Sequence, residues 1–383
     1  MSYNPIPNLL SPLYRSGLLQ TVEWTLSECP PLRSKIAVIT GGQSGIGAEI
    51  VKQLLLHDIG HVVVLARSRE KFEFAREEWG KFRSHEEVVE KVEFVECDLT
   101  DLKVVDRVGK ELLGRLERLD MLFLNAAIPN IPNYELSPQG VETIFAANHL
   151  GHFHLTDTLL PLLRSTPKTY SVSSTRIIVS SSSLHHFCGS IDVQSLTSPI
   201  PPSSKLGATY TSLYRYARSK LANILFTKAL SRRLENEKVF VNAYFPGNVP
   251  TSSMDTWKEH LGHAFGSVLP EFFRWVGQTL EDGATTGVFL AAAKEVETDG
   301  CKGEYWVPIA RKESCSTAAS DERLAERLWV WSEGFVKGAL QSGHEADVNT
   351  PIARGITMAP DYEKGRRSTR ESVPCMCHHY PIL

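Results

Sequence analysis

The chain has 383 residues, of which 42% are hydrophobic and 22% charged, and its formal net charge is −3. This near balance, without a basic stripe interleaved with aromatic residues, argues against a nucleic-acid partner. Seven cysteines at scattered positions predict free thiols in a reducing compartment, and we expect a cytoplasmic location. The first residues lack the pattern of a secretory signal, and no apolar run is long enough to predict a membrane span.

A strand, a glycine-rich turn and a helix are predicted in direct succession near the start. Residues 35–40 are apolar or β-branched, Gly41-Gly-Gln43-Ser44-Gly45-Ile46-Gly47 follows, and residues 48–57 have helical periodicity. The glycines let a pyrophosphate approach the backbone closely, and the helix N-terminus attracts its negative charge. The turn therefore predicts a dinucleotide site, with an ordinary glycine-rich turn as the alternative.

Arg67 directly follows the next predicted strand, residues 61–66. An acidic residue at this point would accept hydrogen bonds from the adenosine ribose and select NAD, whereas an arginine pairs with the 2′-phosphate of NADP. We therefore expect NADP. A solvated surface arginine is the alternative, because Arg69 and Lys71 follow.

Strands and helices continue to alternate along the chain. Strands are predicted at 92–99, 119–127, 175–179 and 240–245, and a helix at 102–116. This order predicts an α/β fold, a Rossmann-type doubly wound parallel sheet in a single domain with a C-terminal helical extension.

Asn148 lies inside a predicted helix, where an asparagine is unfavourable because its side chain competes for backbone hydrogen bonds. Something in the fold should compensate for it. His149, His152 and His154 are not predicted to bind metal, because their spacing scatters them and no acidic or cysteine partner is expected nearby.

Two polar groups of the second half predict acid–base chemistry. Tyr216 and Lys220 are one helical turn apart, so the phenol and the ammonium share a face. A buried cation beside a phenol lowers the pKa of the phenol, which suits proton transfer to a carbonyl or from an alcohol. Four serines, residues 180–183, follow the predicted strand 175–179.

The pattern Thr40-Gly41-x-x-x-Gly45-Ile46-Gly47, with Tyr216-x-x-x-Lys220 far downstream, resembles the short-chain dehydrogenase/reductase family. The string that starts at Asn148, Asn-His-Leu-Gly-His-Phe, is similar to the retinol dehydrogenase and protochlorophyllide reductase branch. The long serine run and the aromatic C-terminal helix look like fungal members, which suggests secondary metabolism.

The resemblance implies roles for particular residues. Ser182 is the catalytic serine, with Ser181 and Ser183 as one-residue register alternatives, and Asn148 anchors a water in a proton relay. Tyr216 transfers the proton, and Lys220 lowers its pKa and holds the nicotinamide ribose. The implied cofactor-binding residues are Thr40, Gly41, Gln43, Ser44, Gly45, Ile46, Gly47, Arg67, Asp98, Leu99, Asn125, Ala126, Lys220, Pro246, Gly247, Val249 and Thr251. The turn after Asn125 has Ala127 where the family has glycine, so it is the least faithful motif.

The resemblance also implies a reaction. We expect reversible hydride transfer between NADP(H) and a carbonyl or alcohol of a hydrophobic small molecule, without metal. Reduction of a carbon–carbon double bond and a non-catalytic, NADP-binding regulatory role are the alternatives. A homodimer through the long helices is the expected assembly.

Segments on both sides of residues 35–310 are expected to be accessory. Residues 1–34 form an N-terminal extension, and residues 252–282 a substrate lid. The apolar segments 9–26 and 267–280 have peripheral membrane contact as an alternative. Residues 311–341 are a helical extension that packs on the domain, and residues 342–383 a disordered tail.

Overall fold

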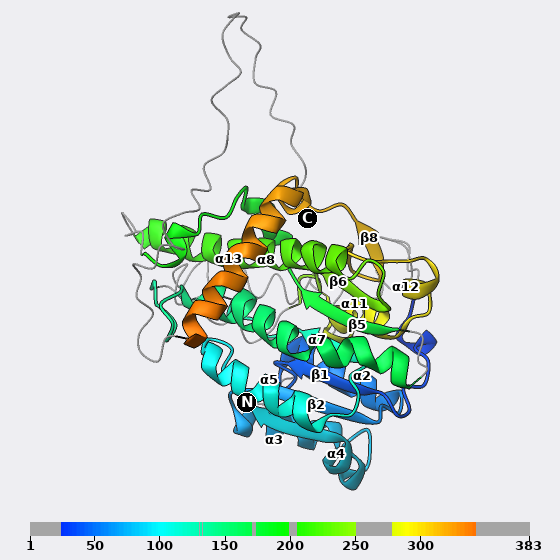
Figure 1. The fold of residues 1–383 in the computed structure, drawn as a ribbon. Coiled ribbons are helices and arrows are strands. Elements are labelled where there is room, and N and C mark those ends of the chain that lie inside the picture. Colours follow the sequence, from blue (N-terminus) through cyan, green and yellow to red (C-terminus); the bar gives the residue numbers. More distant parts are fainter. Residues whose placement is uncertain are drawn as a thin grey trace, which may run out of the picture.

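The computed structural model describes residues 24–129, 131, 133–170, 174–198, 205–249 and 278–341. Its centre is an eight-stranded sheet in the order β3-β2-β1-β4-β5-β6-β7-β8 (Figure 1). The strands are β1 (Ile36–Thr40), β2 (His61–Ala66), β3 (Val92–Glu96), β4 (Met121–Leu124), β5 (Thr175–Ser180), β6 (Val239–Tyr244), β7 (Tyr305–Val307) and β8 (Arg311–Glu313). Neighbouring strands run parallel except β7 and β8, which pair antiparallel.

Helices connect the strands and cover both faces of the sheet (Figure 1). The α-helices are α2 (Gly45–Leu56), α3 (Arg69–Trp79), α4 (His85–Lys91), α5 (Leu102–Arg115), α6 (Thr143–Phe145), α7 (Gly151–Thr169), α8 (Lys205–Arg233), α11 (Leu280–Ala292), α12 (Glu295–Thr298) and α13 (Glu322–Gln341). Short 3-10 helices are η1 (Leu26–Glu28), η3 (Ser183–Phe187), η4 (Gln194–Leu196) and η6 (Ala318–Ser320), and η2 (Ala146–Leu150) is a π-helix.

The pleat of the strands divides the core into two layers. In β1, Val38 packs with the buried faces of α5, α7, α8 and α13, whereas Ala37 and Ile39 pack with α2, α3 and α11 on the other face. Successive side chains of a strand point to opposite faces, so a strand covered on both sides is apolar throughout. This explains why the central strands are continuous apolar runs rather than alternating ones.

The strand order reverses between β1 and β4, which are paired with each other. The chain leaves both strands at the same edge of the sheet, because they are parallel. In open α/β sheets this reversal opens a crevice at the carboxyl ends of the strands, where ligands bind. The glycine turn after β1 and the turn at Asn125 after β4 border this position.

The predicted fold class, a doubly wound parallel sheet with a C-terminal helical extension, is confirmed. α13 packs on α8, where the Phe226 and Trp329 rings stack with centroids 6.0 Å apart. The sequence did not predict β7 or β8, which have three residues each, nor α3, α4 and α11. Of the predicted N-terminal extension, Trp24 is buried and its ring meets Phe289 of α11 edge-on.

Two expected segments lie largely or wholly outside the described residues: most of the lid, and the whole tail from residue 342. Most of the apolar segment 9–26 and of the segment 267–280 also falls there. Among the helices within the described ranges, none combines the length and apolarity that crossing a bilayer requires.

Candidate functional site

The glycine turn after β1 has the backbone that its sequence predicts. Gly41 and Gly45 have φ of +69° and +55°, a region that favours glycine. Gly47, in the first turn of α2, has no room for a side chain. A Cβ there would overlap the Gly41 carbonyl oxygen and lie 2.6 Å from the Asn125 Nδ2. The turn is therefore a tight cradle that opens at the N-terminus of α2.

The hydroxyl of Thr40 links the turns that follow β1 and β4. It accepts hydrogen bonds from the backbone N–H groups of Asn125 and Ala126, each 3.0 Å long, and lies 2.8 Å from His152 Nε2. The Asn125 side chain donates in return to the Thr40 carbonyl at 3.2 Å. Both turns are thus held together at the crevice.

Several groups at this edge fit a phosphorylated dinucleotide. The Gln43 Oε1 is buried without a hydrogen-bond partner among the described residues, so it remains available to a ligand. Ser44 is the N-cap of α2, but its side chain makes no capping bond, so N–H groups of the first turn stay available to an anion. Ile46 is partly buried against the core.

Arg67 is exposed and has no ion pair or hydrogen bond within the described part of the chain. The neighbouring arginine differs. Arg69 lies over the Phe94 ring at 4.5 Å and 3.8 Å from Glu73. The guanidinium at 67 is thus free to meet a ligand, whereas the one at 69 is already engaged.

The remaining predicted cofactor residues that the structure describes follow the carboxyl ends of β3 and β6, at the same edge of the sheet. Asp98 Oδ1 accepts from the Thr100 N–H at 2.9 Å and from its hydroxyl, and Leu99 is buried. Gly247, after Pro246, has φ of +95°. Val249 is buried against α11, where a Cβ on Gly283 would lie 2.7 Å from it. Thr251 lies outside the described residues.

Tyr216 and Lys220 lie on α8 beside the end of β5. The Lys220 Nζ is 5.5 Å from the centre of the Tyr216 ring and donates to the Ser180 carbonyl at 3.2 Å. The Tyr216 phenol is hydrogen-bonded to the side chain of Ser182. The structure therefore brings together the phenol, the ammonium and one serine hydroxyl.

The other serines of the run are engaged differently. Ser181 is buried and its hydroxyl donates to the Lys220 carbonyl at 2.9 Å, which ties β5 to α8. Ser183 begins η3. Of the three register alternatives, Ser182 is the one whose hydroxyl meets the phenol.

The pKa values of the pair are set mainly by burial. Desolvation raises the pKa of Tyr216 to about 12, and the hydrogen bond with Ser182 opposes that rise. Desolvation lowers the pKa of Lys220 to about 7. The expected lowering of the phenol pKa by Lys220 is not found in this structure, because burial is the main influence on the phenol and raises its pKa.

Asn148 is fully buried in the π-helix η2, not in a regular α-helix. Its Oδ1 accepts from the Ile128 N–H at 2.7 Å. Its Nδ2 donates to the Ile128 carbonyl and to the Ser219 hydroxyl, each at 3.0 Å. These bonds compensate for an asparagine inside a helix, and they link the loop after β4 to the helix of Tyr216. Single-turn π-helices are frequent at functional sites.

The three histidines near Asn148 have separate partners. His149 Nε2 lies 3.0 Å from the Ser332 hydroxyl of α13, and His152 Nδ1 lies 3.1 Å from the Asn148 carbonyl. Burial lowers the pKa of both imidazoles to about 3. The expectation that no acidic partner is nearby is wrong for His154, whose Nε2 lies 3.1 Å from an Asp106 oxygen.

Sequence reasoning missed a buried ionic cluster beside Tyr216. Glu142 is 0% exposed, and its oxygens lie 3.0 Å from Arg215 and 3.6 Å from Arg218, which are 4% and 2% exposed. The same carboxylate accepts from the N–H groups of Ile144 and Phe145. The partners are 73 residues apart or more, so no local pattern reveals the cluster.

Arg215 and Arg218 also form hydrogen bonds to two loops. Arg215 donates to the Ile131 and Asn133 carbonyls, and Arg218 donates to the Ser195 hydroxyl at 2.6 Å. The cluster thus fastens two loops to the helix that carries the phenol.

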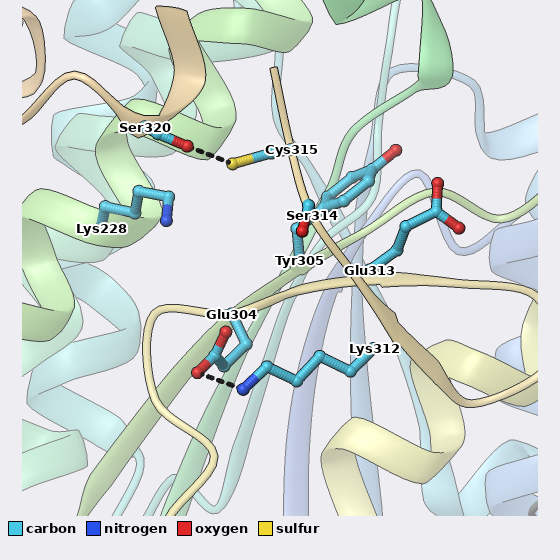
Figure 2. A pocket seen from close by; sticks show the side chains of 8 residues that line it. All are labelled: Lys228, Glu304, Tyr305, Lys312, Glu313, Ser314, Cys315 and Ser320. Carbon is cyan, nitrogen blue, oxygen red and sulfur yellow. Dashed lines mark hydrogen bonds and ion pairs between the residues drawn. The ribbon is translucent and has the colours of Figure 1, made fainter. Parts of the chain in front are cut away.

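A cavity of about 290 Å³ lies elsewhere, between α8 and the β7–β8 edge (Figure 2). No predicted site residue lines it. Its lining is polar, and its carboxylates are paired: Lys312 with Glu304 at 2.8 Å, and Glu313 with Arg311 at 2.9 Å. We therefore do not place the chemistry in this cavity.

The chain is similar to known proteins in the region that carries this site. Residues 35–190 match a family model described as short chain dehydrogenase. A short-chain dehydrogenase/reductase of Armillaria gallica is 31% identical over 81% of this chain and 93% of its own. Human retinol dehydrogenase 14 is 36% identical over 80% of this chain and 87% of its own. A crystal structure of an uncharacterized protein from Mycobacterium paratuberculosis aligns with a TM-score of 0.60 and 27% identity. The alignment covers 83% of this chain and 98% of that protein.

Replacing Gly47 by alanine should weaken nicotinamide cofactor binding by at least about tenfold, because the new Cβ forces the cradle apart. Titration calorimetry measures the effect. Gly114→Ala is the matched control, since a Cβ there meets nothing within 4 Å. Unchanged affinity in a folded Gly47→Ala protein would contradict the cradle.

Glu142→Ala should lower the free energy of unfolding by about 3 to 5 kcal/mol, because it leaves two buried guanidinium groups without their carboxylate. Urea denaturation measures it. Glu111→Ala is the control: Glu111 lies 3.5 Å from Arg115 in a largely exposed pair, and such pairs contribute about 0 to 1 kcal/mol. A similar loss in both variants would show that the cluster is not specially stabilising.

Proposed function

Because the chain belongs to the short-chain dehydrogenase/reductase family, whose members are oxidoreductases with a nicotinamide cofactor, we propose that it is an NADP(H)-dependent enzyme acting on a carbonyl or alcohol. The similarity to retinol dehydrogenase 14 confirms the branch that the sequence suggested. The observation that carries the proposal is the Tyr216 phenol, hydrogen-bonded to Ser182 with Lys220 beneath its ring.

These residues support a division of roles in the reductive direction. When bound, the reduced nicotinamide supplies a hydride to the carbonyl carbon. Ser182 donates a hydrogen bond to the carbonyl oxygen and polarises it. Tyr216, whose pKa of about 12 keeps the phenol protonated at neutral pH, gives its proton to the same oxygen.

We propose that Lys220 and Asn148 belong to the proton relay that restores the Tyr216 phenol. With a pKa near 7, the Lys220 ammonium gives up and regains a proton easily at neutral pH, which suits a group that restores the phenol. We propose that it also holds the nicotinamide ribose, as the family resemblance implies. Asn148 braces the loop at Ile128 against Ser219, and we propose that it holds the water that joins Lys220 to solvent.

The choice of NADP over NAD rests on Arg67. An exposed guanidinium without a protein partner, placed where β2 ends beside the crevice, matches the needs of a 2′-phosphate. The turn at Ser44 and Gly47, at the N-terminus of α2, is suited to the pyrophosphate of either cofactor.

A hydrophobic substrate is supported by exposed apolar side chains that lie close in sequence to the proposed catalytic groups. Phe187, at the end of the 3-10 helix that follows Ser182, is 71% exposed. Leu213, three residues before Tyr216 on α8, is 37% exposed. We propose that they contact the apolar part of the substrate. A cytoplasmic location and a homodimer stay predictions.

Tyr216→Phe should lower kcat by about 10² to 10⁴, because the ring remains but its proton donor is lost, while NADPH affinity changes little. A panel of aldehydes, ketones and alcohols, followed by absorbance at 340 nm with each cofactor, provides the assay. Tyr170→Phe is the control, since Tyr170, the C-cap residue of α7, donates to the exposed Glu117 at 3.4 Å and is not a proposed site residue. Wild-type turnover in Tyr216→Phe would refute the role of the phenol.

Arg67→Ala should weaken NADPH binding by about 10-fold to 150-fold, the value of a charge-assisted contact of about 1.5 to 3 kcal/mol, and leave NADH binding nearly unchanged. Arg69→Ala should leave the ratio of the two affinities unaltered, because Arg69 is engaged with Phe94 and Glu73. Equal weakening of both cofactors by Arg67→Ala would speak against the assignment.

A further inference from the structure

His185 joins Ser182 to a distant part of the chain. It is fully buried in η3, three residues after Ser182. Its Nδ1 lies 2.7 Å from the Ser182 carbonyl oxygen, and its Nε2 lies 3.1 Å from the backbone nitrogen of Ser316, which follows β8. The imidazole therefore spans the space between the serine loop and the segment that leads to α13.

The two partners determine the tautomer of the ring. A backbone N–H can only donate, so Nε2 of His185 must accept the hydrogen bond from Ser316. The proton therefore sits on Nδ1 and is donated to the Ser182 carbonyl. Only the neutral imidazole satisfies both bonds, and burial lowers the pKa of His185 to about 4, so this form prevails at neutral pH.

The buried Tyr305 ring meets the imidazole edge-on, with centroids 5.0 Å apart, and limits its movement. The His186 ring lies 4.1 Å away between centroids but is exposed, so it adds little restraint. Tyr305 belongs to β7 and also lines the polar cavity, next to Cys315 (Figure 2). The ring thus has little freedom to leave its two hydrogen bonds.

The Ser182 residue is constrained from both of its ends. Its carbonyl accepts from the His185 N–H at 3.2 Å as well as from the ring, and its hydroxyl accepts from the Leu184 N–H at 3.2 Å while it bonds the Tyr216 phenol. Its backbone is extended, with φ −157° and ψ 153°. The direction of its hydroxyl therefore follows from where its carbonyl is held.

We propose that His185 is a positioning residue, which aims the Ser182 hydroxyl at the substrate oxygen by holding the Ser182 carbonyl. It contacts neither substrate nor cofactor. This inference rests on the proposed function, because it assumes that Ser182 and Tyr216 act on one substrate oxygen. A displacement of about 1 Å at such a group costs about 10² in rate.

Two substitutions of His185 each retain one of the two hydrogen bonds that its imidazole makes. In His185→Asn the side-chain amide replaces the Nδ1 donor and retains the bond to the Ser182 carbonyl. In His185→Gln the longer side chain puts its carbonyl near Nε2 and retains the bond to Ser316 instead. His185→Phe keeps the ring and removes both bonds. His186→Gln, at an exposed neighbour, is the matched control.

Steady-state kinetics with the best substrate of the carbonyl panel, cofactor titration and urea denaturation are measured for each variant. We expect kcat to fall about 10-fold to 100-fold in His185→Gln and His185→Phe, and to stay within about threefold in His185→Asn and His186→Gln. KM and cofactor affinity should change less than about threefold in all four. If His185→Phe does not fold, the comparison of His185→Asn with His185→Gln still tests the proposal.

Equal losses of kcat in His185→Asn and His185→Gln, or wild-type kcat in both, would overturn the inference. So would losses that follow the unfolding midpoint rather than the retained bond, since a merely structural histidine predicts that pattern. Tyr216→Phe, assayed in parallel, separates the two proposals. If it stays active the proposed function fails, whereas its inactivity beside fully active His185 variants removes only the role of His185.

Discussion

The hydroxyl of Thr40 is the contact on which the arrangement of the crevice depends. It accepts from two consecutive backbone N–H groups after β4 while it terminates β1, and it lies against His152 of α7. The chain leaves the two strands for different connections at this point, and the hydroxyl bonds the one turn to the other. Because they are held together, the glycine cradle, Asn125 and the π-helix with Asn148 keep a common frame.

The side chains proposed to act in catalysis, and those that support them, are anchored by hydrogen bonds to backbone carbonyls. The carbonyl of Ser180 accepts from both Lys220 at 3.2 Å and Asn223 at 3.0 Å, and the carbonyl of Ser182 accepts from His185. The Ser180 carbonyl belongs to β5, and the Ser182 carbonyl lies two residues beyond the end of that strand, so both side-chain contacts are made at the carboxyl edge of the sheet. This arrangement explains how a single phenol, ammonium and hydroxyl can be kept in register on elements far apart in sequence.

Much of the fold was predictable because its signals are local. The apolar runs of strands β1 to β6, the glycine turn and the one-turn spacing of Tyr216 and Lys220 are all short-range patterns. β7 and β8, with three residues each, are too short to show a period. Glu142 and His185 could not be predicted as parts of the site, because their partners lie 73 and 131 residues away. The pKa of Tyr216 could not be predicted either, since it depends on how much solvent the fold removes.

The contact between α13 and the rest of the molecule has a practical consequence for anyone who wishes to shorten this protein. α13 covers the apolar side of α8 through Leu328 and Trp331, and its Ser332 is the partner of the buried His149. A chain cut after β8 would expose that surface to water and leave the His149 imidazole without its Ser332 partner. Truncated versions should therefore aggregate during expression. A shortened protein should end beyond Gln341 rather than before Glu322.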